Sequence, residues 1–173
     1  MQQPLISEIS RKHKLKLLLK YLRSGASILE VGAGSAWFSE QLRKRGYVVT
    51  TLDLVPPADI VGDINQWKQL GIRPHSFDVV VALEVVEHID CLATLRSVCK
   101  VGGLIMLSSP HPKWDWTMKI LEFLHFNQKR TSAHVNLTDF NCIEMPALVR
   151  KRPMFIHQVA IFKNEDLLTK RCT

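Results

Sequence analysis

The sequence of 173 residues predicts an α/β fold with a doubly wound, mostly parallel sheet and helices on both faces. Two observations support this. Residues 28–53 run through an apolar stretch, a glycine pair, a helical segment and a second apolar stretch that ends at Asp53. The runs at 77–83 and 104–108 lack polar alternation, which is typical of strands buried on both faces. The length suits a single domain over residues 1–173.

The first 24 residues form a basic leading segment. Apolar residues recur at three- and four-residue spacing over residues 5–23, which predicts an amphipathic helix that stops at Ser24-Gly25. Residues 1–23 contain six Lys and Arg residues and a single acid, Glu8, so this segment holds most of the net charge of +7. We interpret the charges as a solvated helix face. A patch for an anionic partner such as RNA is the alternative.

A glycine loop, Gly32-Ala33-Gly34, joins the strand at 28–31 to the helix at 36–45. Glycines let the backbone turn sharply and approach a ligand, and the amides of the following helix point at that ligand. Asp53 ends the next strand, 21 residues beyond Gly32, where a carboxylate accepts hydrogen bonds from both ribose hydroxyls. The segment therefore predicts a site for a nucleotide-type cofactor.

Two side chains disfavour a dinucleotide at this site. Trp37 stands where the dinucleotide fingerprint has its third glycine, and an indole does not fit the tight turn around a pyrophosphate. Glu30 precedes the loop and would repel a pyrophosphate, but it suits a cationic ligand. An NAD(P)-dependent oxidoreductase is therefore the less favoured alternative.

With these residues, the sequence resembles the class I S-adenosylmethionine (SAM)-dependent methyltransferases. Residues 30–34 match the family's first motif, an acid followed by G-x-G, with Ala36 where a third glycine is common. Residues 77–88, F-D-x-V followed by E-x-x-E-H, are similar to the fourth-strand pattern of one large branch. The resemblance covers residues 25–110 well and the remainder loosely.

The resemblance implies a Rossmann-like sheet of seven strands in the order 3-2-1-4-5-7-6. Residues 143–150 and 154–162 are expected to form the closing antiparallel strands. In the family a helix normally precedes these closing strands, but here only a short segment near residues 138–140 could form it. The far edge of the sheet is therefore expected to be complete or abbreviated. Residues 111–137, with a probable helix at 114–126, are expected to form a substrate lid.

The resemblance also implies SAM as the cofactor. Its adenosine is expected to lie along Asp53, Leu54, Asp63 and Ile64, and its methionine end along Glu30, Gly32, Ala33, Gly34, Leu83 and Glu84. Asp63 has a second interpretation as a helix N-cap.

A divalent metal is a further expectation, because E-x-x-E-H at a strand-to-helix turn directs Glu84, Glu87 and His88 to one point. This pattern resembles two branches of the fold, the small-RNA 3′-end 2′-O-methyltransferases and the ubiquinone-pathway O-methyltransferases. A further histidine, His134 or His111, would complete the metal site. In the alternative without metal, Glu84 faces the methionine end of the cofactor and His88 caps a helix or acts as a base.

The function that these residues predict is methyl transfer from SAM to an acceptor, with a small-molecule hydroxyl favoured. His88, His111 and His134 are the candidate bases. The alternatives are a metal-dependent RNA 2′-O-methyltransferase and a catalytically silent SAM-fold binding subunit. No apolar run has the length of a membrane span, and the four cysteines form no C-x-x-C pair, so we expect a reducing, cytoplasmic setting.

Overall fold

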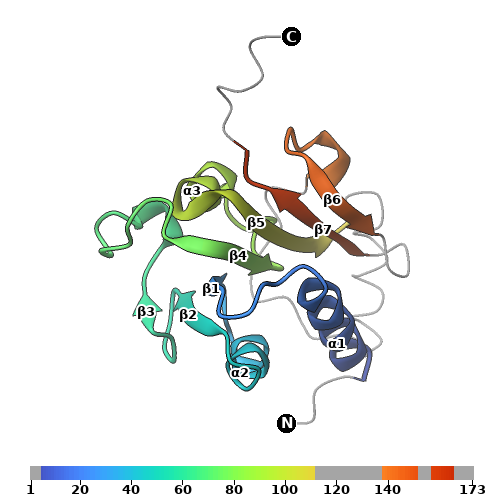
Figure 1. Cartoon of the computed structure of the whole chain (residues 1–173), viewed down its shortest axis with the longest axis horizontal. Coiled ribbons are helices and arrows are strands. Elements are labelled where there is room, and N and C mark those ends of the chain that lie inside the picture. Colours follow the sequence, from blue (N-terminus) through green and yellow to red (C-terminus); the bar gives the residue numbers. More distant parts are fainter. Residues whose placement is uncertain (1–4, 112–137, 152–156, 166–173) are drawn as a thin grey trace.

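The computed structural model describes residues 5–111, 138–151 and 157–165, and these build one seven-stranded sheet (Figure 1). The strands lie in the order β3-β2-β1-β4-β5-β7-β6, as predicted. They are β1 (Ser27–Val31), β2 (Val48–Asp53), β3 (Ile60–Val61), β4 (Phe77–Leu83), β5 (Cys99–Pro110), β6 (Ala147–Lys151) and β7 (His157–Lys163). Both closing strands are present, so the far edge of the sheet is not abbreviated.

Strand direction determines which side chains meet. β1 is parallel to β2 and β4, β4 is parallel to β5, and β7 runs antiparallel between β5 and β6. The carboxyl ends of β1, β2, β4 and β5 therefore share one edge of the sheet. Because β7 is antiparallel, its first residue, His157, reaches the same edge and pairs with Pro110 at the end of β5.

Two apolar cores cover the two faces of the sheet, since successive strand residues point to opposite sides. Ile28 belongs to the core on the side of α1 (Leu5–Leu19) and α2 (Trp37–Arg43), whereas Leu29 packs on the side of α3 (Leu92–Val98). A 3-10 turn, η1 (Ile64–Gln66), joins the second core. Figure 1 shows α1 and α2 together, away from α3.

The leading helix ends at Leu19, earlier than the predicted Arg23. Leu15, Leu17 and Leu18 are buried against the sheet, which fixes the inward face of α1. Lys14 lies on this face and is only 5% exposed. The prediction of a solvated basic face is therefore wrong at Lys14, whereas Lys12 is exposed.

β5 begins at Cys99, five residues before the run predicted at 104–108, and so includes the glycine pair Gly102-Gly103. Gly102 has φ +78, and the β4–β5 register shifts between Phe77 and Val79. A Cβ on Gly103 would lie 2.8 Å from the backbone oxygens of Asp78 and Lys100. The pair therefore lies in a bulged start of β5, where the chain passes too close to its neighbours for a side chain.

Two sequence predictions cannot be compared with this fold. The expected helix at 114–126 and nearly all of the expected lid at 111–137 lie outside the described residues. Of the described residues between β5 and β6, residues 138–146 contain one 3-10 turn, η3 (Phe140–Cys142).

Substitution of Gly103 by Ala should destabilise the fold by about 1–3 kcal/mol, because its Cβ overpacks against backbone that cannot rotate away. Urea unfolding followed by circular dichroism measures this change. Gly25→Ala is the matched control: its φ is +70 with no atom within 4 Å of a Cβ, so it carries only backbone strain of about 1–2 kcal/mol. Wild-type stability in Gly103→Ala would contradict the close approach.

Candidate functional site

The predicted cofactor residues gather at the carboxyl edge of the sheet. Glu30 lies in β1, Asp53 ends β2, and Glu84 directly follows β4. β1 lies between β2 and β4, where the chain changes direction across the sheet, and ligands of open α/β sheets bind at this switch point. The structure thus brings the three acids predicted around the ligand to one edge.

The glycine loop has the conformation that the sequence predicted. Gly32 has φ +72, and a Cβ there would collide with the Val85 side chain. The Gly34 amide donates a hydrogen bond of 2.8 Å to Oδ2 of Asp53. Ala36, in place of the third glycine, has φ 56, so it bears a left-handed conformation that costs roughly 1–2 kcal/mol.

The residues expected to line the adenosine differ in how exposed they are and in what they contact. Leu54 is exposed beside Asp53. Asp63 accepts a hydrogen bond of 2.9 Å from the Asn65 amide, which confirms its interpretation as a cap of the η1 turn. Ile64 is 2% exposed and belongs to the core, so its side chain offers almost no surface to an adenine. Contacts of these residues with adenosine stay predictions.

Glu30 is a buried acid with an unsatisfied oxygen. The residue is 3% exposed, and its Oε2 atom has no hydrogen-bond partner. Burial raises the pKa of Glu30 to about 7, although hydrogen bonding with Ser39 opposes the rise. A cationic ligand nearby would favour the ionised carboxylate.

Glu84 is the most heavily contacted acid of this edge. Its Oε1 atom accepts hydrogen bonds of 2.6 Å from Lys14 Nζ and 2.6 Å from Ser108 Oγ. Its Oε2 atom lies 3.4 Å from Nδ1 of His157. Burial alone would raise the pKa of Glu84, but the Lys14 ammonium and the His157 ring hold it well below its ordinary range. Glu84 also has φ 58, a strained backbone of the kind that clusters at functional sites.

Glu87 lies on the neighbouring turn and is 1% exposed. Burial, reinforced by the Glu84 charge, raises the pKa of Glu87 to about 8. Its Oε2 atom has no hydrogen-bond partner. The pKa values of these two neighbouring acids are therefore shifted in opposite directions, so that Glu84 is the group that favours the negative charge.

The described residues do not fit the expected metal site. Within residues 5–111, 138–151 and 157–165, no three His, Cys, Asp or Glu side chains are arranged to hold an ion. The Lys14 ammonium contacts the carboxylate of Glu84, where a divalent cation would be repelled. His134 lies outside the described residues, so the metal stays a prediction.

Two histidines that the sequence favoured, His88 and His111, lie near this edge together with one that it did not, His157. His88 lies on the turn after β4, and its amide donates a 2.9 Å bond to the Val85 carbonyl. His111 is buried, with Nε2 3.7 Å from Oδ2 of Asp139. His157 stands beside Glu84 with 26% of its side chain exposed.

Sequence reasoning missed three contacts of Glu84, namely Lys14, Ser108 and His157. Lys14 and His157 are 70 and 73 positions away from Glu84, in segments without a motif. The sequence indicated only the position of Ser108, because this residue lies at the end of a predicted strand next to the strand that Glu84 follows.

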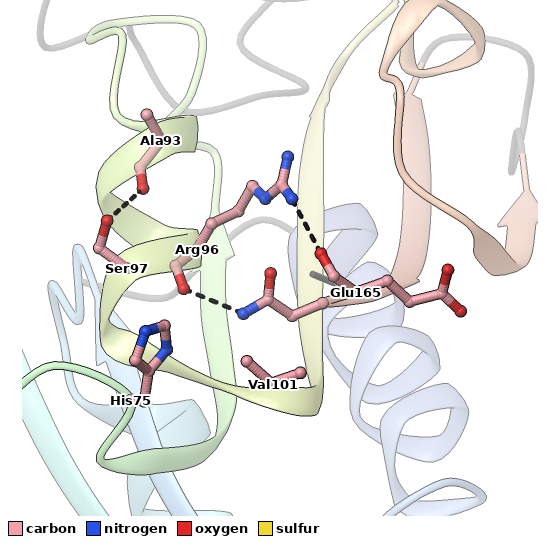
Figure 2. A pocket seen from close by; sticks show the side chains of 7 residues that line it. His75, Ala93, Arg96, Ser97, Val101 and Glu165 are labelled. Carbon is pink, nitrogen blue, oxygen red and sulfur yellow. Dashed lines mark hydrogen bonds between the residues drawn. The ribbon is translucent and has the colours of Figure 1, made fainter. Parts of the chain in front are cut away.

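A separate pocket of about 260 Å³ lies at the opposite, amino edge of the sheet (Figure 2). The Arg96 guanidinium donates to the Glu165 carbonyl at 3.0 Å, and the Asn164 amide donates to the Arg96 carbonyl at 2.9 Å. These polar groups tie the end of β7 to α3. The pocket is lined by His75, Ala93, Arg96, Ser97, Val101, Asn164 and Glu165. None of the predicted site residues lines it.

A family model described as a methyltransferase domain matches residues 4–141. This chain belongs to the methyltransferase domain family. Membership confirms the resemblance to class I SAM-dependent methyltransferases and the expected enzyme class and cofactor, SAM. It does not distinguish the E-x-x-E-H branch.

Curated relatives of this methyltransferase-family chain include two named ubiquinone biosynthesis O-methyltransferase. The protein of Xanthomonas campestris pv. campestris (strain B100) is 34% identical over 103 residues, covering 49% of this chain and 43% of the relative. That of Xylella fastidiosa (strain M23) is 30% identical over 104 residues, covering 50% and 42%. The chain thus spans less than half the length of either relative.

Solved structures share the fold. A Pyrococcus horikoshii OT3 protein superposes with a TM-score of 0.64 at 17% identity, over 90% of each chain. A SAM-dependent methyltransferase of Archaeoglobus fulgidus gives 0.61 at 14% identity, over 90% of this chain and 93% of that chain. Among the described residues, no helix has both the length and the apolar character needed to cross a membrane.

The protonation of Glu30 should make the stability of the methyltransferase depend on pH. The native carboxyl keeps its proton to about pH 7, whereas the unfolded chain releases it near 4.5, so the native state binds more protons between these values. Stability from this group therefore falls as the pH rises from 4.5 to 7, by about 3 kcal/mol for a shift of this size.

Glu30→Gln tests this, because glutamine stays neutral. Its free energy of unfolding relative to wild type should grow by about 3 kcal/mol between pH 4.5 and 7.5, measured by urea denaturation without ligand. Glu40→Gln, an exposed acid on α2, is the control and should show no such trend. Parallel pH profiles for Glu30→Gln and wild type would contradict the raised pKa.

Proposed function

We propose that this chain transfers a methyl group from SAM to a hydroxyl group of a small molecule. The observation that carries the proposal is the carboxylate of Glu84, which stands at the switch point between a charged partner and a histidine. The relatives are named O-methyltransferases, which favours an oxygen acceptor. That residues 1–173 act as one domain stays part of the proposal, because the relatives are longer.

The residues at the carboxyl edge suit a cationic adenosyl ligand. Asp53 would accept hydrogen bonds from the ribose, and the Gly32–Gly34 loop lets the backbone approach the ligand. Glu84, with Glu30 nearby, would face the ammonium and sulfonium charges. SAM supplies an activated methyl group whose thioether leaves without an acid, so the protein contributes mainly alignment.

A hydroxyl acceptor needs a base, and His157 fits this role best among the described histidines. Its Nδ1 atom lies 3.4 Å from the Glu84 carboxylate, so the ring would donate Nδ1–H to Glu84 and offer Nε2 to the acceptor. The distance is long for a hydrogen bond, as is common before substrate binds. His111 is buried against Asp139, which suits positioning rather than contact with an acceptor.

The leading helix gives less support to an RNA acceptor. Its cation Lys14 points into the site, and Lys12 is paired with Glu8 at 2.7 Å. These contacts leave fewer unpaired positive charges on α1 for phosphate than the sequence suggested.

Two measurements test the proposed function. Calorimetric titration with S-adenosylhomocysteine should show binding to the purified chain. Methyl transfer from labelled SAM should then be assayed on phenols, catechols and aliphatic alcohols, with RNA and protein pools in parallel. Transfer to RNA alone would contradict a small-molecule acceptor, and no S-adenosylhomocysteine binding at millimolar concentration would overturn the function.

Substitution of His157 by Gln should lower kcat for a hydroxyl acceptor by about 10²-fold or more, because general-base catalysis contributes this much. S-adenosylhomocysteine affinity should fall much less than kcat, since the proposed role of the ring is in the chemical step rather than in cofactor binding. His13→Gln, an exposed histidine on α1, is the control and should keep wild-type kcat. Unchanged kcat in His157→Gln would exclude the ring as the base.

A further inference from the structure

The outer face of the layer formed by α1 and α2 is strongly basic. Residues 1–47 contain nine Lys and Arg residues and three acids, which gives six of the seven net positive charges of the chain. Five of these cations are exposed and form no ion pair with any residue that the structure describes. They define the basic patch: Lys16, Lys20, Arg23, Lys44 and Arg45.

The cations of the basic patch lie on one continuous surface, although they come from two helices. Lys16 and Lys20 are four residues apart, which places them one turn apart on the side of α1 that faces away from its buried leucines. The turns that follow α1 and α2 lie side by side, because the Val48 amide donates a hydrogen bond of 3.3 Å to the Ala26 carbonyl. Figure 1 shows the two helices together on one side of the sheet.

Acidic residues are absent from the segments that build the patch. The sequence has no Asp or Glu in residues 9–29 or 41–52, and the acid closest to the patch in sequence is Glu40, one turn before Lys44. A surface that serves solubility alone intersperses charges of both signs, whereas an area of one sign creates a potential that attracts opposite charges. The basic patch therefore suits a partner with many negative charges.

The side chains around the patch favour a lipid bilayer over a nucleic acid. Ile9 on the outer side of α1 is 60% exposed, and Val48 after the α2 turn is 64% exposed, so aliphatic groups accompany the cations. The rings that could stack on bases, those of Tyr21, Trp37 and Tyr47, pack against the core instead. Because the apolar face of α1 is already buried in that core, the helix would contact a bilayer through its charges rather than by insertion.

We propose that the basic patch docks this chain on the surface of a bilayer that contains anionic phospholipids. Each Lys or Arg near such a bilayer raises the affinity about fivefold, so five cations give about 10³-fold over a neutral bilayer. Lys14 reaches Glu84 from the inner side of α1, so contact through the outer side leaves the cofactor edge uncovered. Docking needs only the exposed face, and it therefore goes beyond the proposed methyl transfer and does not depend on it.

Vesicle sedimentation measures the docking directly. The purified chain should sediment with vesicles of equal parts phosphatidylglycerol and phosphatidylcholine at about 0.1 M salt, and not with phosphatidylcholine alone. It should be released at about 1 M salt, where the Debye length falls from about 10 Å to about 3 Å. Failure to sediment with the anionic vesicles at the lower salt, or undiminished binding at the higher salt, would overturn the docking.

A pair of double variants tests whether the patch itself makes the contact. Lys20→Gln with Lys44→Gln should lower the affinity for the anionic vesicles by about 25-fold, because two cations are lost. Lys68→Gln with Arg73→Gln removes two exposed cations near η1, on the other face of the sheet, and should stay within about twofold of wild type. All four side chains are exposed, so both variants should keep the wild-type circular dichroism. Equal losses in the two variants would show that net charge, and not the patch, governs binding.

Competition with RNA separates the two polyanions. Polyuridine at the same phosphate concentration as the anionic vesicles should leave most of the protein on the vesicles. Displacement of the protein by polyuridine would overturn the proposed docking and assign the basic patch to a nucleic acid.

Discussion

The carboxylate of Glu84 connects the parts of this site. It follows β4, contacts Lys14 of α1 and Ser108 of β5, and faces His157 of β7. Four elements that are distant in sequence thus meet at one side chain. The side chain of Glu84 is 33% exposed, and an anion that is partly removed from water stays ionised when donors and a cation contact it, whereas its pKa rises without them. The arrangement of α1 and β7 against the edge supplies these contacts.

The acids at this edge differ in their pKa values, because they differ in burial and in the cations and donors that contact them. Glu84 has a cation and a hydroxyl at one oxygen, so its pKa is lowered. Burial, reinforced by the Glu84 charge, raises the pKa of Glu87 to about 8, although the Lys14 ammonium opposes the rise. Glu30 is buried under α2, and its pKa rises to about 7. A positively charged ligand would meet one firm anion, and its charge would favour ionisation of the two other carboxyl groups, with loss of their protons to solvent.

The sequence predicted the fold well, including the order of strand, loop, helix and strand over residues 28–53. Apolar runs without alternation identified the buried strands, and the resemblance supplied their order, which the structure confirms. The conformation of the Gly32–Gly34 loop followed from residue types that tolerate left-handed φ. The boundary errors lie at α1 and β5. α1 ends at Leu19, although Tyr21 and Leu22 still pack against the same core, and β5 begins with a bulge where neighbouring backbone leaves no room for a side chain on Gly103.

By itself, the sequence determined local properties: which segments are buried strands, where the chain must turn, and which acids end those strands. These depend on short-range sterics and on periodicity, which are written in adjacent residues. Only the tertiary structure decided the partners of Glu84. Lys14 and His157 are 70 and 73 residues away from it, and a lysine in a basic helix looks the same in sequence whether it faces water or a carboxylate. The packing of Leu15, Leu17 and Leu18 against the sheet fixes the orientation of α1, and in this orientation Lys14 points inward rather than into water.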